Sequence, residues 1–149
     1  MIYIASDHGG FELKEEIKRF LATTGYAFED FGTNSTDSVD YPDYAYKVAK
    51  EVAKSKDNKG ILICNTGAGM CIVANKVKGI RAAECYNEET ARLSRDHNDA
   101  NVLCLGGKMT SKELAEKMVK IWLETPFSNG ERHLRRLGKI PEIEKREMK

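Results

Sequence analysis

Short apolar runs alternate along the chain with longer amphipathic stretches. The apolar runs are bounded by Gly, Asp or Asn, which is typical of buried parallel strands; they cover residues 2–5, 27–31, 61–64, 80–85 and 102–105. Between these runs, apolar residues recur at helical spacing over residues 11–23, 41–56, 68–77, 88–96 and 111–124. A basic segment at about 129–147 predicts a sixth helix.

This alternation of strands and helices predicts an α/β fold, in which helices cover both faces of a parallel sheet. We expect a doubly wound, Rossmann-like sheet of five strands in the order 2-1-3-4-5. The chain contains no internal repeat and no interdomain linker. We therefore expect one domain over residues 1–149, with the basic C-terminal helix at about 129–147 packed on a partner subunit.

Composition narrows the functional classes. The 149 residues are 41% hydrophobic and 32% charged, which is ordinary for a globular domain. A net charge of +1 provides no overall field that would attract nucleic acid or a membrane surface. The chain has no signal-peptide pattern and no long apolar window, so we expect a cytoplasmic protein. Its four cysteines, Cys64, Cys71, Cys85 and Cys104, are then expected to be free thiols.

The predicted topology concentrates reactive side chains at one edge of the sheet. Ligands of open α/β sheets bind at the carboxyl ends of the strands where the strand order reverses, here between strands 1 and 3. Strand 1 runs into Ser-Asp-His-Gly-Gly at residues 6–10, and strand 3 runs into Cys-Asn-Thr-Gly-Ala-Gly at residues 64–69. An acid, an imidazole, a thiol, a hydroxyl and a glycine-rich turn therefore converge on one crevice.

Cys64 is the first candidate for catalysis. The positive end of the following helix favours a thiolate, which is a base or a nucleophile; the alternative is a small apolar residue that completes a buried strand. The turn at residues 65–69 aligns backbone amides at a helix start, where a phosphate or an enediolate oxygen binds. The alternative is a tight turn that needs glycine only for its dihedral angles.

Two further groups carry candidate chemistry. Asp7 and His8 are suited to contacting a sugar hydroxyl or a phosphate, although Asp7 is also a good N-cap for the next helix. His97 and Asn98 precede strand 5, at the amino edge of the sheet. That edge is opposite the crevice of their own chain, so a catalytic role would place them in a neighbour's site and require an oligomer. Otherwise they form a capped helix end and a solvated loop.

The C-terminal segment contains the main cationic cluster. Arg132 and Arg136 are four residues apart and share a helical face, which suits a phosphate; the alternative is a solvated basic face.

Several rival sites are excluded by the sequence. Met70 stands where a tyrosine-phosphatase loop needs Arg, and the chain has no dinucleotide fingerprint, no P-loop and no zinc-ligand spacing,.

Ordered motifs over nearly the whole chain resemble the ribose-5-phosphate isomerase B family, which includes the galactose-6-phosphate isomerase subunits. The matching segments are Ser6-Asp7-His8-Gly9-Gly10, Gly32-Thr33, Asp40-Tyr41-Pro42, Gly60-Ile61-Leu62-Ile63-Cys64, Thr66-Gly67, Gly69-Met70, Ala74-Asn75-Lys76-Val77, Gly79-Ile80-Arg81-Ala82-Ala83, Ser94-Arg95, His97-Asn98-Asp99-Ala100-Asn101 and Arg132-His133.

The resemblance implies an aldose–ketose isomerase of the pentose phosphate pathway, which interconverts ribose 5-phosphate and ribulose 5-phosphate through a cis-enediolate. It implies no metal and no cofactor, and a homodimer or homotetramer with sites between subunits. Cys64 matches the base that moves a proton between C2 and C1. The positions linked to substrate hydroxyls and ring opening are Asp7, Thr66 and His97.

The resemblance also implies a set of substrate-binding positions. Tyr41 and Asn98 match contacts to the sugar, and Gly67 and Gly69, in the turn with Asn65, match the anion hole. Phosphate-site positions are matched by His8, Lys108, Arg132 and Arg136, with His133 beside them.

Three positions depart from the family pattern. Asn65 stands where the family usually has Gly, and Cys71 replaces a common Ser, at a position where some members have a catalytic Glu. Lys108 replaces an Arg that often assists phosphate binding, which keeps the charge but loses the bidentate fork.

Two other functions remain open: an isomerase of allose or galactose 6-phosphate, and a non-catalytic sugar-phosphate sensor on the same fold. The galactose enzymes divide the site residues between unlike subunits, whereas this chain holds the full set.

Overall fold

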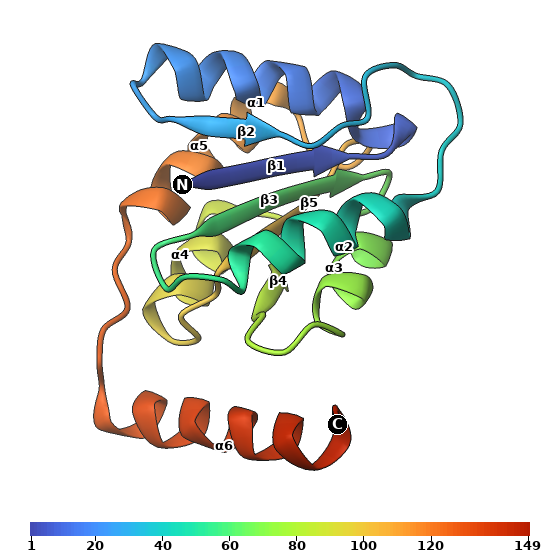
Figure 1. Ribbon diagram of the computed structural model, residues 1–149. Coiled ribbons are helices and arrows are strands. Elements are labelled where there is room, and N and C mark those ends of the chain that lie inside the picture. The colour runs from blue at the N-terminus through green and yellow to red at the C-terminus, as the bar shows by residue number, and fades with distance from the viewer.

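A computed structural model describes all 149 residues. Five parallel strands form one sheet, namely β1 (Ile2–Ser6), β2 (Phe28–Asp30), β3 (Lys59–Cys64), β4 (Ala82–Glu84) and β5 (Val102–Gly106). The helices are α1 (Phe11–Thr23), α2 (Tyr41–Val52), α3 (Ala68–Ala74), α4 (Glu88–Asp96), α5 (Lys112–Glu124) and α6 (Glu131–Glu147), with a short 3-10 turn at His8–Gly10 (Figure 1). The predicted class, a doubly wound parallel sheet with an extra C-terminal helix, is confirmed.

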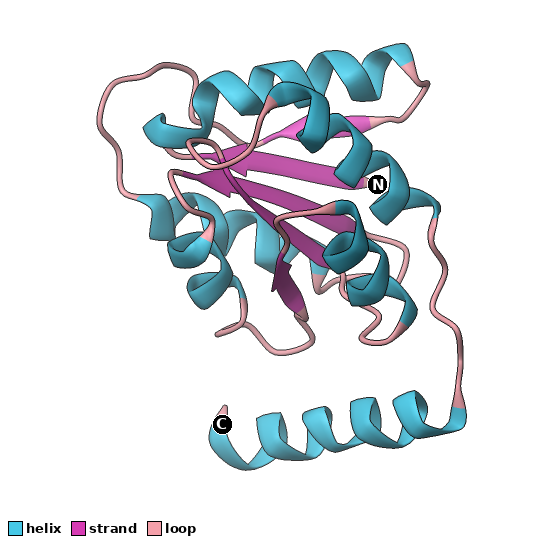
Figure 2. Ribbon diagram, turned by 180° about the vertical axis from the view of Figure 1, so that it is seen from behind, coloured by secondary structure: helices cyan, strands magenta, loops and turns pink.

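Helices cover both faces of the sheet, as alternating strands and helices require. The side chains of α2 and α3 pack on one face, and those of α1, α4 and α5 pack on the other (Figures 1 and 2). Successive side chains of a strand point to opposite faces. In β3, Ile61 and Ile63 therefore join the core under α1 and α5, whereas Leu62 and Cys64 join the core under α2 and α3.

The order of the last two strands differs from the expected 2-1-3-4-5. The observed order is β2-β1-β3-β5-β4, so β5 lies next to β3 and β4 forms the edge. All five residues of β5 are buried, whereas the three residues of β4 are half-buried or exposed. The longer apolar strand therefore takes the position with neighbours on both sides. The reversal of strand order between β1 and β3 is unchanged, so the expected position of the crevice is unaffected.

Side-chain caps mark the starts of α4 and α5. Ser111 caps α5 by accepting a hydrogen bond from the Leu114 amide, and Asn87 and Thr90 form a reciprocal capping box at α4,. The predicted helices over 41–56 and 68–77 end earlier, at Val52 and Ala74. The residues beyond these ends form turns that lead into the next strands.

Helix α6 stands apart from the domain body. None of its residues is buried, and a long extended connection separates it from α5 (Figures 1 and 2). Leu134, Ile140 and Ile143 are exposed on it. Its contacts with the body include a hydrogen bond of 2.6 Å from the Gly79 amide to Oε2 of Glu144. None of the helices has the length and apolar character needed to cross a membrane.

Candidate active site

The thiol of Cys64 lies at the carboxyl end of β3, next to the first turn of α3. The residue is 5% exposed, and its Sγ accepts a hydrogen bond of 3.2 Å from the Gly67 amide. Gly67 has a φ of +86°, a conformation that glycine adopts without strain. A side chain there would also lie 3.0 Å from the carbonyl carbon of Leu105. Gly67 therefore fixes the sharp turn that brings an N–H group to the thiol.

Backbone amides beyond this turn are available to a ligand. The amides of Gly69 and Met70, in the first turn of α3, have no acceptor in the chain, as expected at a helix start. The Ala68 amide is occupied by Oγ1 of Thr66, at 3.2 Å. The ring of Tyr41 packs on Gly69 so closely that a β-carbon there would lie 2.6 Å from Cε1 of the ring. The structure thus places the ring of Tyr41 next to the free amides of the predicted anion hole.

The loop after β1 contributes Asp7 and His8 to the same edge. Oδ1 of Asp7 accepts hydrogen bonds from the Gly9 and Gly10 amides at 2.9 and 3.1 Å, so the capping interpretation is confirmed for this oxygen. Oδ2 makes no hydrogen bond within the chain. The Val39 amide donates to Nδ1 of His8 at 3.2 Å, which leaves Nε2 of the imidazole to donate to a ligand.

Asn65 connects the two loops of the crevice. Its side-chain oxygen lies directly over Gly9, where a β-carbon would collide with it. The Lys108 amide donates to the Asn65 carbonyl at 3.0 Å, and the Gly107 amide donates to the Cys64 carbonyl at 2.7 Å. The backbone of Lys108 therefore lies beside the turn. The side chain of Asn65 packs against the loop after β1.

The second thiol, Cys71, lies on the next turn of α3 and has different neighbours. Its Sγ lies 3.5 Å from the Ala82 carbonyl oxygen and 3.6 Å from Nδ2 of Asn75, so it points toward β4. A hydrogen bond from Cys104 lowers the pKa of the Cys71 thiol, while that interaction and burial raise the pKa of Cys104. The four cysteines are free, and no group of His, Cys, Asp and Glu side chains has the arrangement of a metal site.

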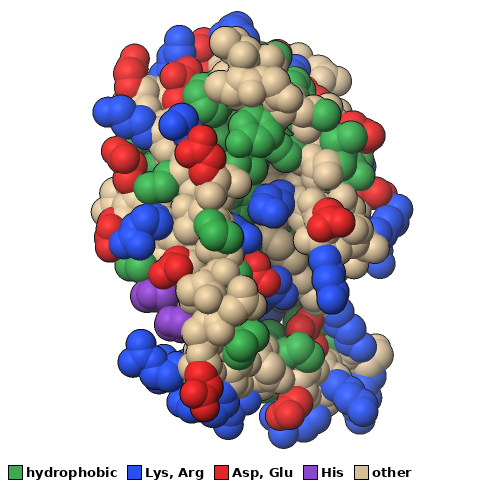
Figure 3. All heavy atoms as spheres, turned by 90° about the vertical axis from the view of Figure 1, so that its left-hand side faces the viewer, with side chains coloured by type: hydrophobic (Ala, Val, Ile, Leu, Met, Phe, Trp, Pro, Cys, Tyr) green, Lys and Arg blue, Asp and Glu red, His purple; other side chains and the backbone are tan.

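The remaining predicted site residues lie at the opposite edge of the sheet. The ring of His97, which follows α4, stacks on His133 of α6 with a centroid distance of 4.3 Å and an interplanar angle of 15°. Partial desolvation and charge interactions with His97, Arg132 and Arg136 lower the pKa of His133. Figure 3 shows histidine side chains between the body and the basic side chains of α6.

The chain thus holds two separate groups of predicted site residues. One group lies at the carboxyl ends of β1, β3 and β5 and at the start of α2: Asp7, His8, Tyr41, Cys64, Asn65, Thr66, Gly67, Gly69 and Lys108. The other group lies at the amino edge and on α6: His97, Asn98, Arg132, His133 and Arg136. Roughly 16 Å of strand separates the two edges, because β3 is six residues long.

Sequence reasoning missed two positions that shape the crevice. Val39 fixes the orientation of the His8 ring, and Gly107 ties the end of β5 to Cys64. Both residues act through backbone N–H groups, which every residue type except proline provides. No side-chain signal in the sequence identifies them.

The chain is similar to known proteins over nearly its whole length. The family described as Ribose/Galactose Isomerase matches residues 2–140. Ribose-5-phosphate isomerase B of Escherichia coli is 46% identical, over 97% of each chain. The solved structure of Clostridium thermocellum ribose-5-phosphate isomerase B is 53% identical with a TM-score of 0.94, over 97% of each chain.

A third relative was solved with a sugar phosphate present. The structure of Mycoplasma genitalium ribose-5-phosphate isomerase B, described with bound ribulose 5-phosphate, is 46% identical with a TM-score of 0.93. The match covers 97% of this chain and 95% of that one. Matches of this extent and identity, together with the family match, show that the chain belongs to the ribose/galactose isomerase family.

Proposed function

We propose that this protein interconverts ribose 5-phosphate and ribulose 5-phosphate, as an enzyme of the pentose phosphate pathway in the cytoplasm. One observation carries the proposal: the Cys64 thiol lies beside the free amides of the first turn of α3. A base next to an anion hole suits proton transfer between adjacent carbons of a sugar. Family membership and the ribulose 5-phosphate described in the Mycoplasma genitalium relative support a pentose phosphate as the substrate.

The central step is a proton transfer through a cis-enediolate. The Cys64 thiolate removes the proton from C2 of the open-chain aldose, and the electron pair moves onto the carbonyl oxygen at C1. The proton of the C2 hydroxyl passes to the oxygen at C1, and the resulting thiol returns a proton to C1, which leaves the carbonyl at C2 and gives the ketose. The enediolate oxygen accepts hydrogen bonds from the amides at the start of α3, and one such donor is typically worth about 3 kcal/mol.

Ring opening and phosphate binding use the other predicted residues. Asp7 or Thr66 exchanges protons with the furanose ring, together with His97 from a second copy of the chain. His8 and Lys108 of this chain bind the phosphate of the substrate, and Arg132 and Arg136 of the second copy bind the same phosphate. The separation of the two groups within one chain supports this division, since neither group alone includes both the base and the arginine pair.

The surroundings of the two thiols favour Cys64 over Cys71 as the base. Cys64 receives the Gly67 N–H and faces the start of α3, whereas Cys71 faces the Ala82 carbonyl oxygen. The Cys64 sulfur therefore lies at the turn that carries the free amides, and the Cys71 sulfur does not. The lowered pKa of Cys71 therefore belongs to a thiol directed at β4 rather than at the turn.

The test is an assay of ribulose 5-phosphate formation from ribose 5-phosphate, in the presence of reductant and chelator. We expect Cys64→Ala to lose at least about a hundredfold in turnover, since a general base typically contributes a factor of about 10²–10⁴. Substrate binding, measured by calorimetry, should persist. Cys71→Ala is the matched control, because it removes a neighbouring thiol, on α3, and should retain most of the activity.

The opposite pattern, with activity lost in Cys71→Ala and retained in Cys64→Ala, would assign the base to Cys71. A wild-type protein that turns over allose or galactose 6-phosphate but not ribose 5-phosphate would overturn the choice of substrate. Binding of ribose 5-phosphate without turnover by the wild-type protein would indicate a sensor.

A further inference from the structure

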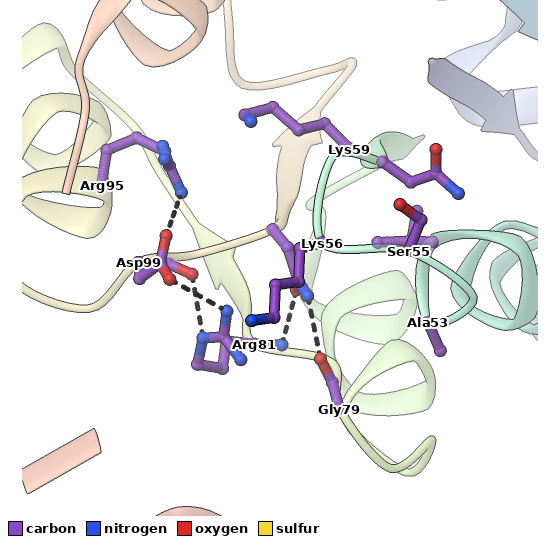
Figure 4. A pocket seen from close by; sticks show the side chains of 11 residues that line it. Ala53, Ser55, Lys56, Lys59, Gly79, Arg81, Arg95 and Asp99 are labelled. Carbon is purple, nitrogen blue, oxygen red and sulfur yellow. Dashed lines mark hydrogen bonds and ion pairs between the residues drawn. The ribbon is translucent and has the colours of Figure 1, made fainter. Parts of the chain in front are cut away.

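A cavity lies at the amino edge of the sheet, away from the Cys64 of the same chain. Its volume is about 440 Å³, which is within the range of small-molecule sites. It is enclosed by the connection between α2 and β3, the segment before β4 and the end of α4 (Figure 4). Lys59 begins β3 and Cys64 ends it, so about 16 Å of strand separates this amino-edge cavity from the thiol.

One wall of the amino-edge cavity carries two arginines bound to a single carboxylate. NH1 of Arg95 lies 2.9 Å from Oδ1 of Asp99, and NH2 of Arg81 lies 3.3 Å from Oδ2 (Figure 4). Nε of Arg81 also donates to the Asp99 carbonyl oxygen at 2.9 Å. The side chain of Arg95 is only 9% exposed. One carboxylate balances one of the two guanidinium charges, so this wall remains cationic.

The facing segment carries two lysines without an ion-pair partner. No carboxylate lies within 4.0 Å of the ammonium group of Lys56 or Lys59. Lys59 is half-buried; burial lowers its pKa, and the positive charge of Arg95 lowers it further. Both effects disfavour the ammonium form. An anion bound beside Lys59 would offset them.

The arginine wall is held in place by a further network. Oδ1 of Asn101 accepts from the Arg81 amide at 2.7 Å, and its Nδ2 donates to the Gly79 carbonyl at 2.8 Å. These residues belong to the ordered motifs of the sequence, yet none has a part in the proposed isomerase site. Hydrogen bonds hold this cationic surface in place at the edge opposite the thiol, and such a fixed surface is suited to binding an anion.

We propose that the amino-edge cavity binds a small compound that carries a diphosphate group, at a site separate from the isomerase site. Four cationic side chains and one carboxylate line the cavity, so a ligand with several negative charges fits better than a monoanion. The charges come from two segments of the cavity wall, and a diphosphate offers one phosphate group to each. Lysine ammonium groups act as point charges toward phosphate oxygens, and the outer N–H groups of Arg81 add directional donors.

The test is a titration of the full-length, ¹⁵N-labelled protein with pyrophosphate at constant ionic strength, followed by amide NMR shifts. We expect saturable shifts at residues 55–60 and 79–81. Lys59→Gln and Lys56→Gln should each weaken pyrophosphate binding by about tenfold, the effect of losing one charged hydrogen bond. Lys54→Gln is the matched control: Lys54 lies in the same connection and pairs with Glu51 at 2.6 Å, but it does not line the cavity, so its removal should leave the affinity unchanged.

Three results would overturn the proposal. Shifts confined to residues 64–69 and 131–136 would place pyrophosphate at the isomerase site alone. Shifts that do not saturate, or an equal loss of affinity in Lys54→Gln, would indicate nonspecific attraction to surface charge. Lys56 is exposed, so Lys56→Gln keeps its fold and gives an answer even if Lys59→Gln is unstable.

Discussion

Several residues in the crevice are important for the backbone conformation they allow rather than for the chemistry of a side chain. The thiol of Cys64 has its hydrogen-bond donor because Gly67 turns the chain with a positive φ. Gly69 lacks a side chain where the Tyr41 ring packs, and Gly9 lacks one where Asn65 lies. The reactive group and the ligand-facing amides thus depend on glycines that carry no chemistry themselves.

Replacement of Gly67 by alanine tests this dependence. We expect Gly67→Ala to lower the free energy of unfolding by more than about 2 kcal/mol, because the left-handed backbone alone costs a non-glycine residue about 1–2 kcal/mol. The new β-carbon would also lie 3.0 Å from the Leu105 carbonyl carbon and 3.1 Å from its oxygen. Urea unfolding of purified variants measures the difference.

Gly79→Ala provides the control for backbone strain. Gly79 has a φ of +85°, and nothing lies within 4 Å of the position of its β-carbon. Its replacement should cost only the backbone strain of about 1–2 kcal/mol. Equal losses in the two variants would show that the contact between Gly67 and Leu105 relaxes without cost. Turnover should fall in Gly67→Ala only, since Gly79 lies at the other edge of the sheet.

At the scale of the element, the edge strand β2 is joined to α1 by a buried ion pair. Lys14 of α1 is fully buried, and its Nζ lies 2.7 Å from Oδ1 of Asp30 and 2.7 Å from the Thr33 carbonyl oxygen. Lys18 adds a contact of 2.8 Å to Oδ2 of Asp30. Strand β2 has only three residues, so these side-chain contacts supplement a short backbone ladder.

Removal of the carboxylate should therefore be costly. We expect Asp30→Asn to lower the free energy of unfolding by about 3 kcal/mol, because it leaves the buried ammonium with only the more distant carboxylate of Glu15, at 3.9 Å,. Glu89→Gln removes the partner of Arg92 in an exposed pair of 2.8 Å and should cost less than about 0.5 kcal/mol. If thermal unfolding gives similar losses for both variants, Lys14 is stabilised by the Thr33 carbonyl rather than by charge.

The same pair predicts a pH dependence. Burial raises the pKa of Asp30, but the hydrogen bonds from Lys14 and Lys18 outweigh it and the pKa is lowered. The stabilisation from a lowered carboxyl pKa is fully present above the unfolded value of about 3.9 and is lost as the pH falls through the folded value. Below about pH 4, wild-type stability should therefore decline more steeply than that of Asp30→Asn.

Sequence patterns predicted which segments form strands and helices better than they predicted the order of the strands in the sheet. Residues 80–85 and 102–105 both form apolar runs, but only the second continues as a fully buried strand, and the order of β4 and β5 depends on that difference in burial. The crevice was predictable because the strand-order rule brings residues 6–10 and 64–69 to one edge. The contact of His8 with the Val39 amide was not, since it arises from the path of a loop without side-chain chemistry.

At the scale of the whole molecule, the arrangement of α6 bears on how the site is completed. Helix α6 has no buried residue, and it carries Arg132 and Arg136 beside the stacked pair of His97 and His133. The thiol and its amides lie at the other edge of the sheet. A second copy of the chain, related by symmetry, can supply the missing group to each crevice, as in a closed isologous dimer.

Hybrid oligomers test this arrangement directly. In a dimer that pairs one Cys64→Ala chain with one His97→Ala chain, one crevice combines both substitutions, and the other combines intact Cys64 with intact His97. Chains carrying two different affinity tags, produced together and purified through both tags, yield only such hybrids. We expect about half of the wild-type activity from these dimers, although each variant alone is nearly inactive. Hybrids as inactive as their parents would show that Cys64 and His97 serve the same crevice from one chain, and failure to recover any doubly tagged protein would show that the chains do not associate.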